Sequence, residues 1–162
     1  MASNAGGRLQ FRCAVHVHWP GVAELGSLGG KDVQEPMGEL QYFSIEGDHA
    51  EYRPTGQVSI PQMVKLVASA IAFAREQQLR KLLVVTSGLV GFEPPALATR
   101  FFFIQEWARV AQGVVKVAMV ARPEMIDPQK FGVTVAVNAG LSSDIFETES
   151  EKEALSWLKN RK

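Results

Sequence analysis

The sequence lacks several features by which functional classes are usually recognised. It has one cysteine, Cys13, which cannot form an internal disulfide, and this scarcity is expected in a reducing compartment. Its 17 basic and 17 acidic residues cancel, so no overall field favours nucleic acid or an anionic bilayer. It also has no run of about 20 apolar residues that would span a bilayer, and no signal-peptide pattern. These absences predict a cytoplasmic protein with no nucleic-acid partner and no membrane span.

Residues 1–38 differ in composition from the remainder of the chain. They contain seven of the fourteen glycines and show no sustained helical or strand period, so we expect a loosely ordered N-terminal arm. Within it, "LQFRCAVHVHW" alternates like a short strand that places His16 and His18 on one face and Cys13 on the other. A zinc site needs three or four converging ligands. We therefore predict no metal site, and no motif elsewhere in the chain predicts a cofactor.

Residues 39–162 carry the pattern of one α/β domain, of a size that can bury a single core. The segments "ELQYFSIEGD" and "HAEYRPTGQVS" are extended and meet at a Gly-Asp turn, which predicts a β-hairpin. Ser59 is a suitable N-cap for the next segment, and Pro61 fits the first turn of a helix. We expect this helix to end near Gln78.

Two later segments, "KLLVVTS" and "VVKVAMVA", are apolar without alternation, as expected of strands covered on both faces. A predicted helix from Pro95 to about Gln112 separates them. At the end of the chain, "SSDIFETES" and "EKEALSWLK" predict a short strand and a terminal helix. The order of elements predicts a mostly parallel sheet with right-handed crossovers, opened by an antiparallel hairpin.

The stretch "DPQKFGVTVAVNAG" gives conflicting signals. Val133, Val135 and Val137 alternate with small or polar residues like a strand, and β-branched residues favour strands. However, Asp127-Pro128 is a good helix start and the closing Asn-Ala-Gly is a good helix stop. We predict a helix here.

The run "RFFFIQEW" carries three consecutive aromatic residues, which cannot all face one side of a helix. Phe101 and Ile104 fit a buried stripe, together with Leu97 and Ala108. Trp107, together with either Phe102 or Phe103, then faces a second surface. Three interpretations of that second surface are open: it is buried under a neighbouring element, it forms a homodimer face, or it lines an apolar-ligand pocket.

The loop "TSGLVGFEPP" follows the first buried strand, where many α/β proteins bind phosphate or place a nucleophile. Its spacing fits neither a P-loop, nor a dinucleotide-binding fingerprint, nor a nucleophile elbow. Ser87 and Gly88 therefore predict a turn, with a modified serine as the alternative. Glu93 before two prolines predicts a rigid helix entry.

Polar residues follow both buried strands, and the carboxyl ends of parallel strands share one edge of a sheet, where open α/β sheets bind ligands. We expect a cleft there, lined by Ser87, Glu93, Arg100, Arg122, Glu124 and Asp127. The set contains no histidine, so it offers no obvious acid-base pair for neutral pH. Anion binding through the two arginines is one interpretation, and solvated ion pairing is the other.

Three stretches carry a resemblance to a known family: "KLLVVTSGLVGFEPPAL", "VVKVAMVA" and "DIFETESEKEALSWLK". Over residues 39–160 the chain resembles the SpoIIAA-like (STAS) superfamily, including its uncharacterised bacterial STAS/SEC14-type branch. The closing pattern from Phe146 to Leu158 is the most distinctive part, with two extra residues before Ala154. The resemblance implies a sheet of four or five strands with alternating helices, and a working surface at the loop between the third strand and the next helix.

In the anti-sigma-antagonist members of that superfamily this loop carries a serine that a partner kinase phosphorylates. Ser87 and Gly88 match the family's Ser-Gly, Glu93 stands at its aspartate position, and Pro94 and Pro95 occupy the positions of its two serines. The acceptor hydroxyl is thus absent, and the phosphorylation switch is not expected.

These observations predict a non-enzymatic regulatory or interaction module of STAS type that binds a protein partner or a small ligand, because no motif supplies a nucleophile, a base and an orienting group together. The alternative is a carrier-like pocket for an apolar or lipid-type ligand. The expected binding residues are Ser87, Gly88, Glu93, Arg100, Arg122 and Asp127, with Phe102, Phe103 and Trp107 at an interface or apolar pocket.

Overall fold

The computed structural model describes residues 41–160 of the chain. The predicted N-terminal arm of residues 1–38 lies outside this part, as do its expected strand and the boundary placed at residue 39. The expected placements of Cys13, His16 and His18 therefore stay predictions from the sequence.

The described chain opens with the predicted hairpin. Strands β1 (Phe43–Glu46) and β2 (His49–Tyr52) pair antiparallel, and Glu46 stands opposite His49 across a two-residue loop. Gly47, the first residue of that loop, has φ of +65°, a left-handed conformation that glycine adopts without steric cost. The Gly-Asp turn signal is confirmed.

Five strands form the main sheet, in the spatial order β1-β2-β4-β6-β7. The last three are β4 (Lys81–Val85), β6 (Lys116–Ala121) and β7 (Ser143–Glu147), and each pairs parallel with its neighbour, as β2 does with β4. The α/β fold with a mostly parallel sheet behind an antiparallel hairpin is therefore confirmed.

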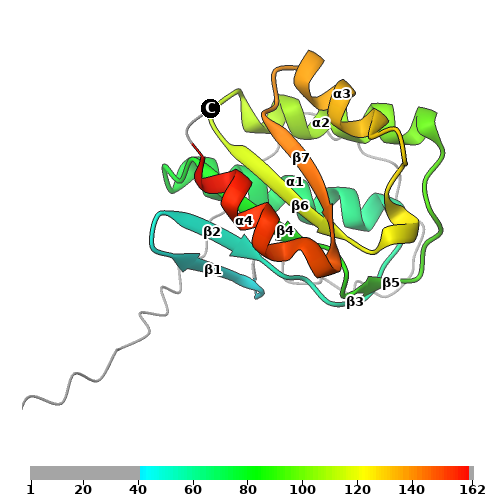
Figure 1. Cartoon of the computed structure of the whole chain (residues 1–162), viewed down its shortest axis with the longest axis horizontal. Helices are drawn as coiled ribbons and strands as arrows, with labels where there is room; N and C mark the ends of the chain where they lie inside the picture. Colours follow the sequence, from blue (N-terminus) through cyan, green and yellow to red (C-terminus); the bar gives the residue numbers. More distant parts are fainter. Residues whose placement is uncertain (1–40, 161–162) are drawn as a thin grey trace, which may run out of the picture. The chain divides into compact units, whose positions relative to one another are not determined.

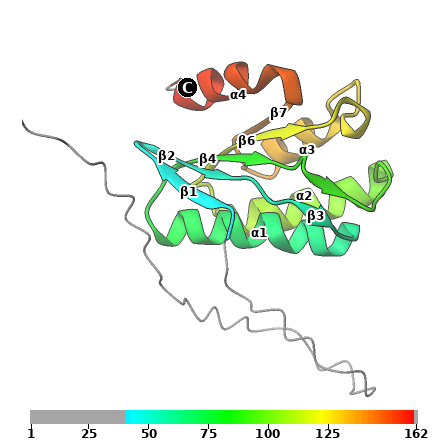
Figure 2. The ribbon, with the colours of Figure 1, turned by 90° about the horizontal axis from the view of Figure 1, so that it is seen from below.

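The sheet is covered unequally by the four α-helices of residues 41–160. They are α1 (Ile60–Glu76), α2 (Leu97–Ala111), α3 (Phe131–Asn138) and α4 (Glu151–Lys159). Successive crossovers of one hand that step in one direction along a sheet place their helices on the same face. Figures 1 and 2 show this arrangement, with α1 and α2 on one side of the sheet and α4 on the other. None of these helices is long and apolar enough to cross a membrane.

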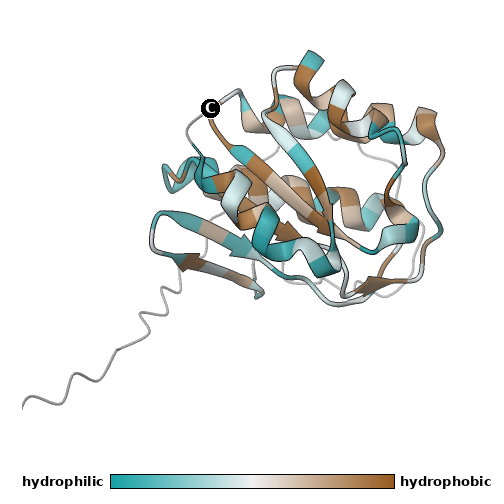
Figure 3. Cartoon of the chain, in the orientation of Figure 1, coloured by the Kyte–Doolittle hydropathy of each residue, from teal (hydrophilic) through white to brown (hydrophobic). Residues whose placement is uncertain are grey.

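The side chains of β4 point alternately to the two faces of the sheet, and both faces are covered by helices. Leu82 and Val84 pack in the larger core beneath α1, α2 and α3, whereas Leu83 and Val85 pack against α4. All four side chains are buried, which explains why the strand shows no polar alternation in sequence. Figure 3 shows most of the neighbouring strand β6 in the hydrophobic colours as well.

Helix α1 begins where its capping residues predict. The hydroxyl of Ser59 accepts a hydrogen bond from the backbone N–H of Gln62 at 3.3 Å, and the Gln62 side chain accepts one from the backbone N–H of Ser59 at 2.8 Å. This reciprocal capping box satisfies two backbone donors that the first turn leaves without helical partners. The helix ends at Glu76, two residues before the predicted end at Gln78, where the backbone turns left-handed.

Helix α3 confirms the helical reading of the valine-rich stretch but starts later than predicted. The expected start at Asp127-Pro128 is wrong, because Lys130 has a left-handed backbone with φ of +50° and the helix begins at Phe131. Asp127 caps it from a distance, since its carboxylate accepts the backbone N–H of Phe131 at 2.8 Å. A 3₁₀ turn, η1 (Pro123–Met125), precedes this cap.

A second, small sheet was not predicted. Strands β3 (Gly56–Gln57) and β5 (Leu89–Val90) pair parallel, and Figure 1 shows them side by side below the main sheet. The stretch that follows β4 therefore runs alongside the β2–α1 connection, in the same direction, instead of forming a free loop.

Candidate functional site

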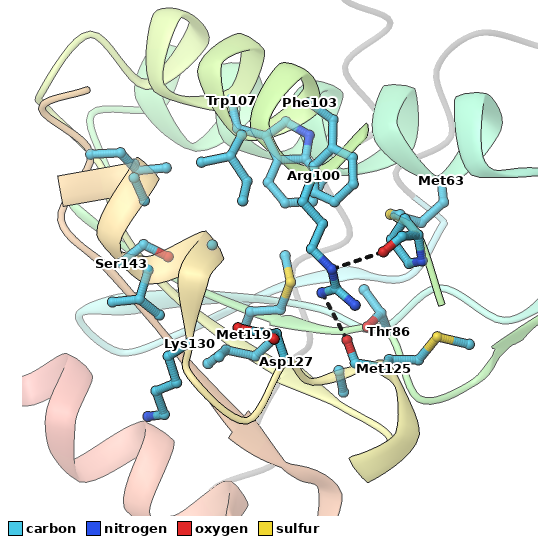
Figure 4. Close-up of a pocket in the computed structure, with 18 of the residues that line it drawn as sticks. Met63, Thr86, Arg100, Phe103, Trp107, Met119, Met125, Asp127, Lys130 and Ser143 are labelled. Atoms are coloured by element: carbon cyan, nitrogen blue, oxygen red, sulfur yellow. Dashed lines mark hydrogen bonds between the residues drawn. The ribbon is translucent and has the colours of Figure 1, made fainter. Parts of the chain in front are cut away.

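A pocket of about 90 Å³ lies between α2, α3 and the face of the sheet that they cover. Figure 4 shows side chains converging on it from both helices, from the sheet and from the loop after β6. Most of its lining is apolar. The lining residues are Met63, Thr86, Phe92, Pro95, Arg100, Phe103, Ile104, Trp107, Met119, Ala121, Arg122, Met125, Asp127, Lys130, Gly132, Val133, Ala136, Leu141, Ser143 and Ile145.

The aromatic wall of the pocket is held in place by contacts outside it. The rings of Phe103 and Trp107 lie 4.7 Å apart between centroids, and the Trp107 indole N–H donates to the carbonyl of Val64 in α1 at 3.0 Å. Trp107 is 5% exposed and Ile104 is 7% exposed. Because the indole is tied to a second helix, this wall is rigid and can pack against an apolar ligand without reorganising.

Arg100 brings a charge into these apolar surroundings. Its Nε donates to the carbonyl of Pro95 at 3.0 Å and its Nη1 donates to the carbonyl of Met125 at 2.9 Å. Figure 4 shows the side chain reaching from α2 between these groups, with Thr86 beside it. Burial lowers the pKa of Arg100, and the charge of Asp127 opposes that shift. The guanidinium still remains charged at neutral pH.

The other charged groups of the pocket are engaged in local structure. Arg122 Nη1 lies 3.1 Å from a carboxylate oxygen of Glu124, and Asp127 caps α3 through Phe131. The ammonium group of Lys130 pairs with a carboxylate of β7 at 2.8 Å. Each of these three charged groups therefore already has a partner within the fold.

The structure brings together three of the predicted edge residues, Arg100, Arg122 and Asp127. Ser87, Gly88, Glu93 and Glu124 do not line the pocket. Ser87 and Gly88 form a turn closed by the Leu89 backbone N–H, which donates to the Thr86 carbonyl at 2.9 Å.

Thr86 takes the place that the sequence prediction gave to its neighbour Ser87. Leu82 and Val84 face the helical layer of α1 to α3, so the strand alternation continues to Thr86 and not to residue 87. The Thr86 hydroxyl donates to the carbonyl of Val120 at 3.2 Å. The period of the strand was the signal that could have identified this residue.

The predicted orientation of α2 is partly wrong. Leu97 and Phe101, which we expected on the buried stripe, are 51% and 42% exposed. The buried residues are instead Ile104, Trp107, Ala108, Val110 and Ala111. Phe103 and Trp107 line the pocket, as the apolar-pocket prediction placed them, whereas Phe102 is 71% exposed and points away. The stripe begins only at Ile104 because α1 and α3 cover the later turns of α2.

A second hollow of about 400 Å³ borders the same loop from the side of β7 and α4. Five of its lining residues are exposed: Pro123, Pro128, Lys130, Glu147 and Glu153. Such an open hollow cannot remove a ligand from water as the smaller pocket can, so the smaller pocket is the candidate site.

A polar cluster that was not predicted lies on the face of β2 that points toward α4. His49 is buried, and its Nε2 lies 3.2 Å from a carboxylate oxygen of Glu51. Arg53 bridges Glu51 and Glu151, which joins β2 to the start of α4. The Arg53 guanidinium lowers the pKa of Glu151, and Glu151 in turn raises the pKa of Arg53. The cluster is a tie between two elements, and no group of His, Cys, Asp and Glu within residues 41–160 is arranged to hold a metal ion.

Comparisons with known proteins do not place the chain in a family. No protein-family model matches it, and no curated protein matches it. Among solved structures it is similar to the NMR structure of the protein TM1081, with 14% identity, over 79% of this chain and 98% of that chain. The TM-score is 0.39, a likeness that carries no argument about the site. The resemblance to the STAS superfamily therefore stays a prediction from the sequence.

Proposed function

We propose that this chain is a non-enzymatic module that binds a small, mainly apolar ligand in the pocket between α2, α3 and the sheet. The observation that carries the proposal is an apolar pocket, walled by Phe103 and Trp107, that also holds the half-buried guanidinium of Arg100. Apolar lining with a few placed polar groups is the usual composition of a small-molecule site.

The size of the pocket limits the ligand. An engineered protein cavity of about 150 Å³ holds one benzene molecule. The 90 Å³ found here is smaller than that cavity, so it favours a short branched chain, or a single ring that it encloses only in part, over a lipid with long acyl chains. Of the two ligands predicted for the carrier-like alternative, the size therefore supports the small apolar ligand.

The bonding of the polar groups supports binding without catalysis. The Asp127 carboxylate accepts the N–H of Phe131, and the Thr86 hydroxyl donates to a main-chain carbonyl. A general base and a nucleophile within reach of each other are needed for covalent catalysis. These two groups already serve the fold, which supports a regulatory or carrier role of the kind that the STAS resemblance implies.

Two substitutions on one helix test the proposal. Val133 lines the pocket, whereas Val137, one turn further along α3, is 60% exposed. Toluene and indole serve as probes, and their binding is followed by NMR. We expect Val133→Phe to weaken probe binding by about tenfold or more, because the added ring occupies the pocket. Val137→Phe should leave it unchanged. A wild-type protein that binds neither probe, or a Val133→Phe variant that binds them equally well, would refute the proposal.

A second candidate function is contact with a protein, including a second copy of this chain. Its support is an exposed apolar patch on the first turns of α2, formed by Leu97, Phe101 and Phe102, with the last two rings 5.7 Å apart. Native mass spectrometry over a range of concentrations tests the homodimer. A dimer that Phe102→Ser dissociates and Val137→Ser does not would support this patch, and a monomer at every concentration would exclude self-association.

A further inference from the structure

The position of Arg100 on α2 is unusual for a charged residue. It stands four residues before Ile104 and seven before Trp107, so it lies on the face of the helix that is otherwise buried and apolar. A charge in such surroundings loses hydration, and this cost persists unless the charge finds a partner.

The bonds that Arg100 makes fix its position but do not neutralise it. Both acceptors, the carbonyls of Pro95 and Met125, are uncharged. Within residues 41–160, Arg100 has no carboxylate oxygen within 4.0 Å, whereas Arg53 pairs with two carboxylates and Arg122 with one. Asp127 acts on Arg100 only through its more distant charge.

The guanidinium is also presented in a form suited to an oxyanion. It carries five N–H donors in a planar fork, and the two bonds to carbonyls engage Nε and Nη1, so Nη2 serves in neither. A fork that is already oriented loses little freedom when it binds a carboxylate, and such charge-assisted bonds are stronger than neutral ones.

We infer that the ligand of this pocket is a small carboxylate with a compact apolar body, whose anionic group binds Arg100 while its body packs against Phe103 and Trp107. The inference rests on the proposed function of the same pocket. Arg122 is the other arginine of the lining, but its contact with Glu124 already supplies an opposite charge. The preference for an anion is therefore assigned to Arg100.

Matched ligands of one shape test the assignment. Benzoate and benzamide share a ring and a planar head group but differ in charge. Binding of each is measured by NMR titration at neutral pH to the wild type, to Arg100→Gln and to Arg109→Gln. Arg109 is the matched control, because it lies on the same helix, is exposed and pairs with Glu106 at 2.6 Å.

We expect the wild type to bind benzoate about tenfold more tightly than benzamide, a difference typical of one charge-assisted contact. Arg100→Gln should lose this preference and keep its affinity for benzamide, whereas Arg109→Gln should keep the preference. Arg100→Lys, which retains the charge but not the fork, should keep only part of it. If Arg100→Gln fails to fold, the ratio of the affinities for benzoate and benzamide, compared between the wild type and Arg100→Lys, tests the inference.

The outcomes separate the two proposals. Equal affinity of the wild type for benzoate and benzamide, or a preference that survives in Arg100→Gln, overturns the inference and leaves small-ligand binding standing. Failure of both compounds, together with toluene and indole, overturns the proposed function and the inference with it.

Discussion

The packing of α3 against α2 predicts an energetic coupling between Gly132 and Ile104 at the wall of the pocket. A Cβ atom on Gly132 would lie 2.8 Å from Cδ1 of Ile104, well inside the distance of about 3.5–4.0 Å at which two carbon atoms attract most strongly. Gly132 is not among the glycines with a positive φ, so its backbone accepts alanine. Crowding by Ile104 is therefore the main obstacle to a side chain there.

The size of the coupling follows from three terms. Gly132→Ala should gain up to about 1 kcal/mol from helix propensity and lose about 1–3 kcal/mol from overpacking, a net loss of about 1 kcal/mol. Ile104→Val removes the crowded methyl group and should cost about 1 kcal/mol. In the double variant the alanine methyl group takes the space that Cδ1 leaves. We expect its free energy of unfolding to lie within about 0.5 kcal/mol of the wild type, a coupling of about 1.5 kcal/mol.

Urea unfolding followed by far-UV circular dichroism measures the free energy of unfolding of the wild type, both single variants and the double variant. Ile71→Val, a fully buried substitution in α1, provides the control pair with Gly132→Ala and should add to it without coupling. If Gly132→Ala and Ile104→Val also add, within about 0.5 kcal/mol, the close approach of the two helices is refuted.

Three further predictions concern the rest of the fold. Burial raises the pKa of Tyr52 to about 12 from an ordinary value of 10.0, so its stabilisation is complete below pH 10 and is lost as the pH rises through 12. The loss should not exceed about 2.7 kcal/mol, the free-energy equivalent of that change in pKa; urea titrations should show it missing in Tyr52→Phe, and equal pH dependence of the two proteins would contradict it. The Arg53 guanidinium lowers the pKa of Glu151, so their pair stabilises above the ordinary carboxylate range and is lost as the pH falls through the lowered pKa. Glu151→Gln should cost about 0.2–1 kcal/mol of stability at neutral pH. It should cost nothing in acid below both the ordinary and the lowered pKa of Glu151, and a cost that persists there would exclude the ion pair as its cause. Gly91 has φ of +97°, and a Cβ there would lie 2.7 Å from a side chain of β3, so Gly91→Ala should cost about 1–3 kcal/mol of stability. Gly47→Ala should cost less, because a Cβ at Gly47 meets no atom within 4 Å. Equal costs of the two substitutions in thermal unfolding would refute the contribution of the steric clash at Gly91.

The elements that sequence reasoning predicts well are those whose signals are local. The capping box at Ser59 and the turn at Gly47 involve groups within three residues of one another, so they can be read without knowing the fold. The pair β3 and β5 is different, because strands of two residues carry no period and form only where Gly56 and Leu89 are brought together. Contacts between distant segments of this kind leave no pattern in either segment.

The candidate site divides in the same way. Arg100, Arg122 and Asp127 could be predicted to lie together, because parallel strands end at a common edge and loops of adjacent strands meet there. For the apolar wall, the sequence left Phe102 and Phe103 as alternatives beside Trp107, since three consecutive phenylalanines offer several faces and only the packing of α2 decides which one is buried. The bond from Trp107 to Val64 is one contact of that packing, and the two residues are 43 positions apart.

The side chains of α3 show why the pocket is a property of this sequence and not of the fold alone. On the pocket side α3 presents Gly132, Val133 and Ala136, which are small, opposite the bulky rings of Phe103 and Trp107 on α2. A larger apolar residue at Val133 would fill the space and add buried apolar surface, which usually stabilises a protein. The pocket instead stays unfilled, and two carbonyls hold the Arg100 side chain in its lining. Such an arrangement is expected where a protein gives up some stability for a binding site, as the proposed function requires.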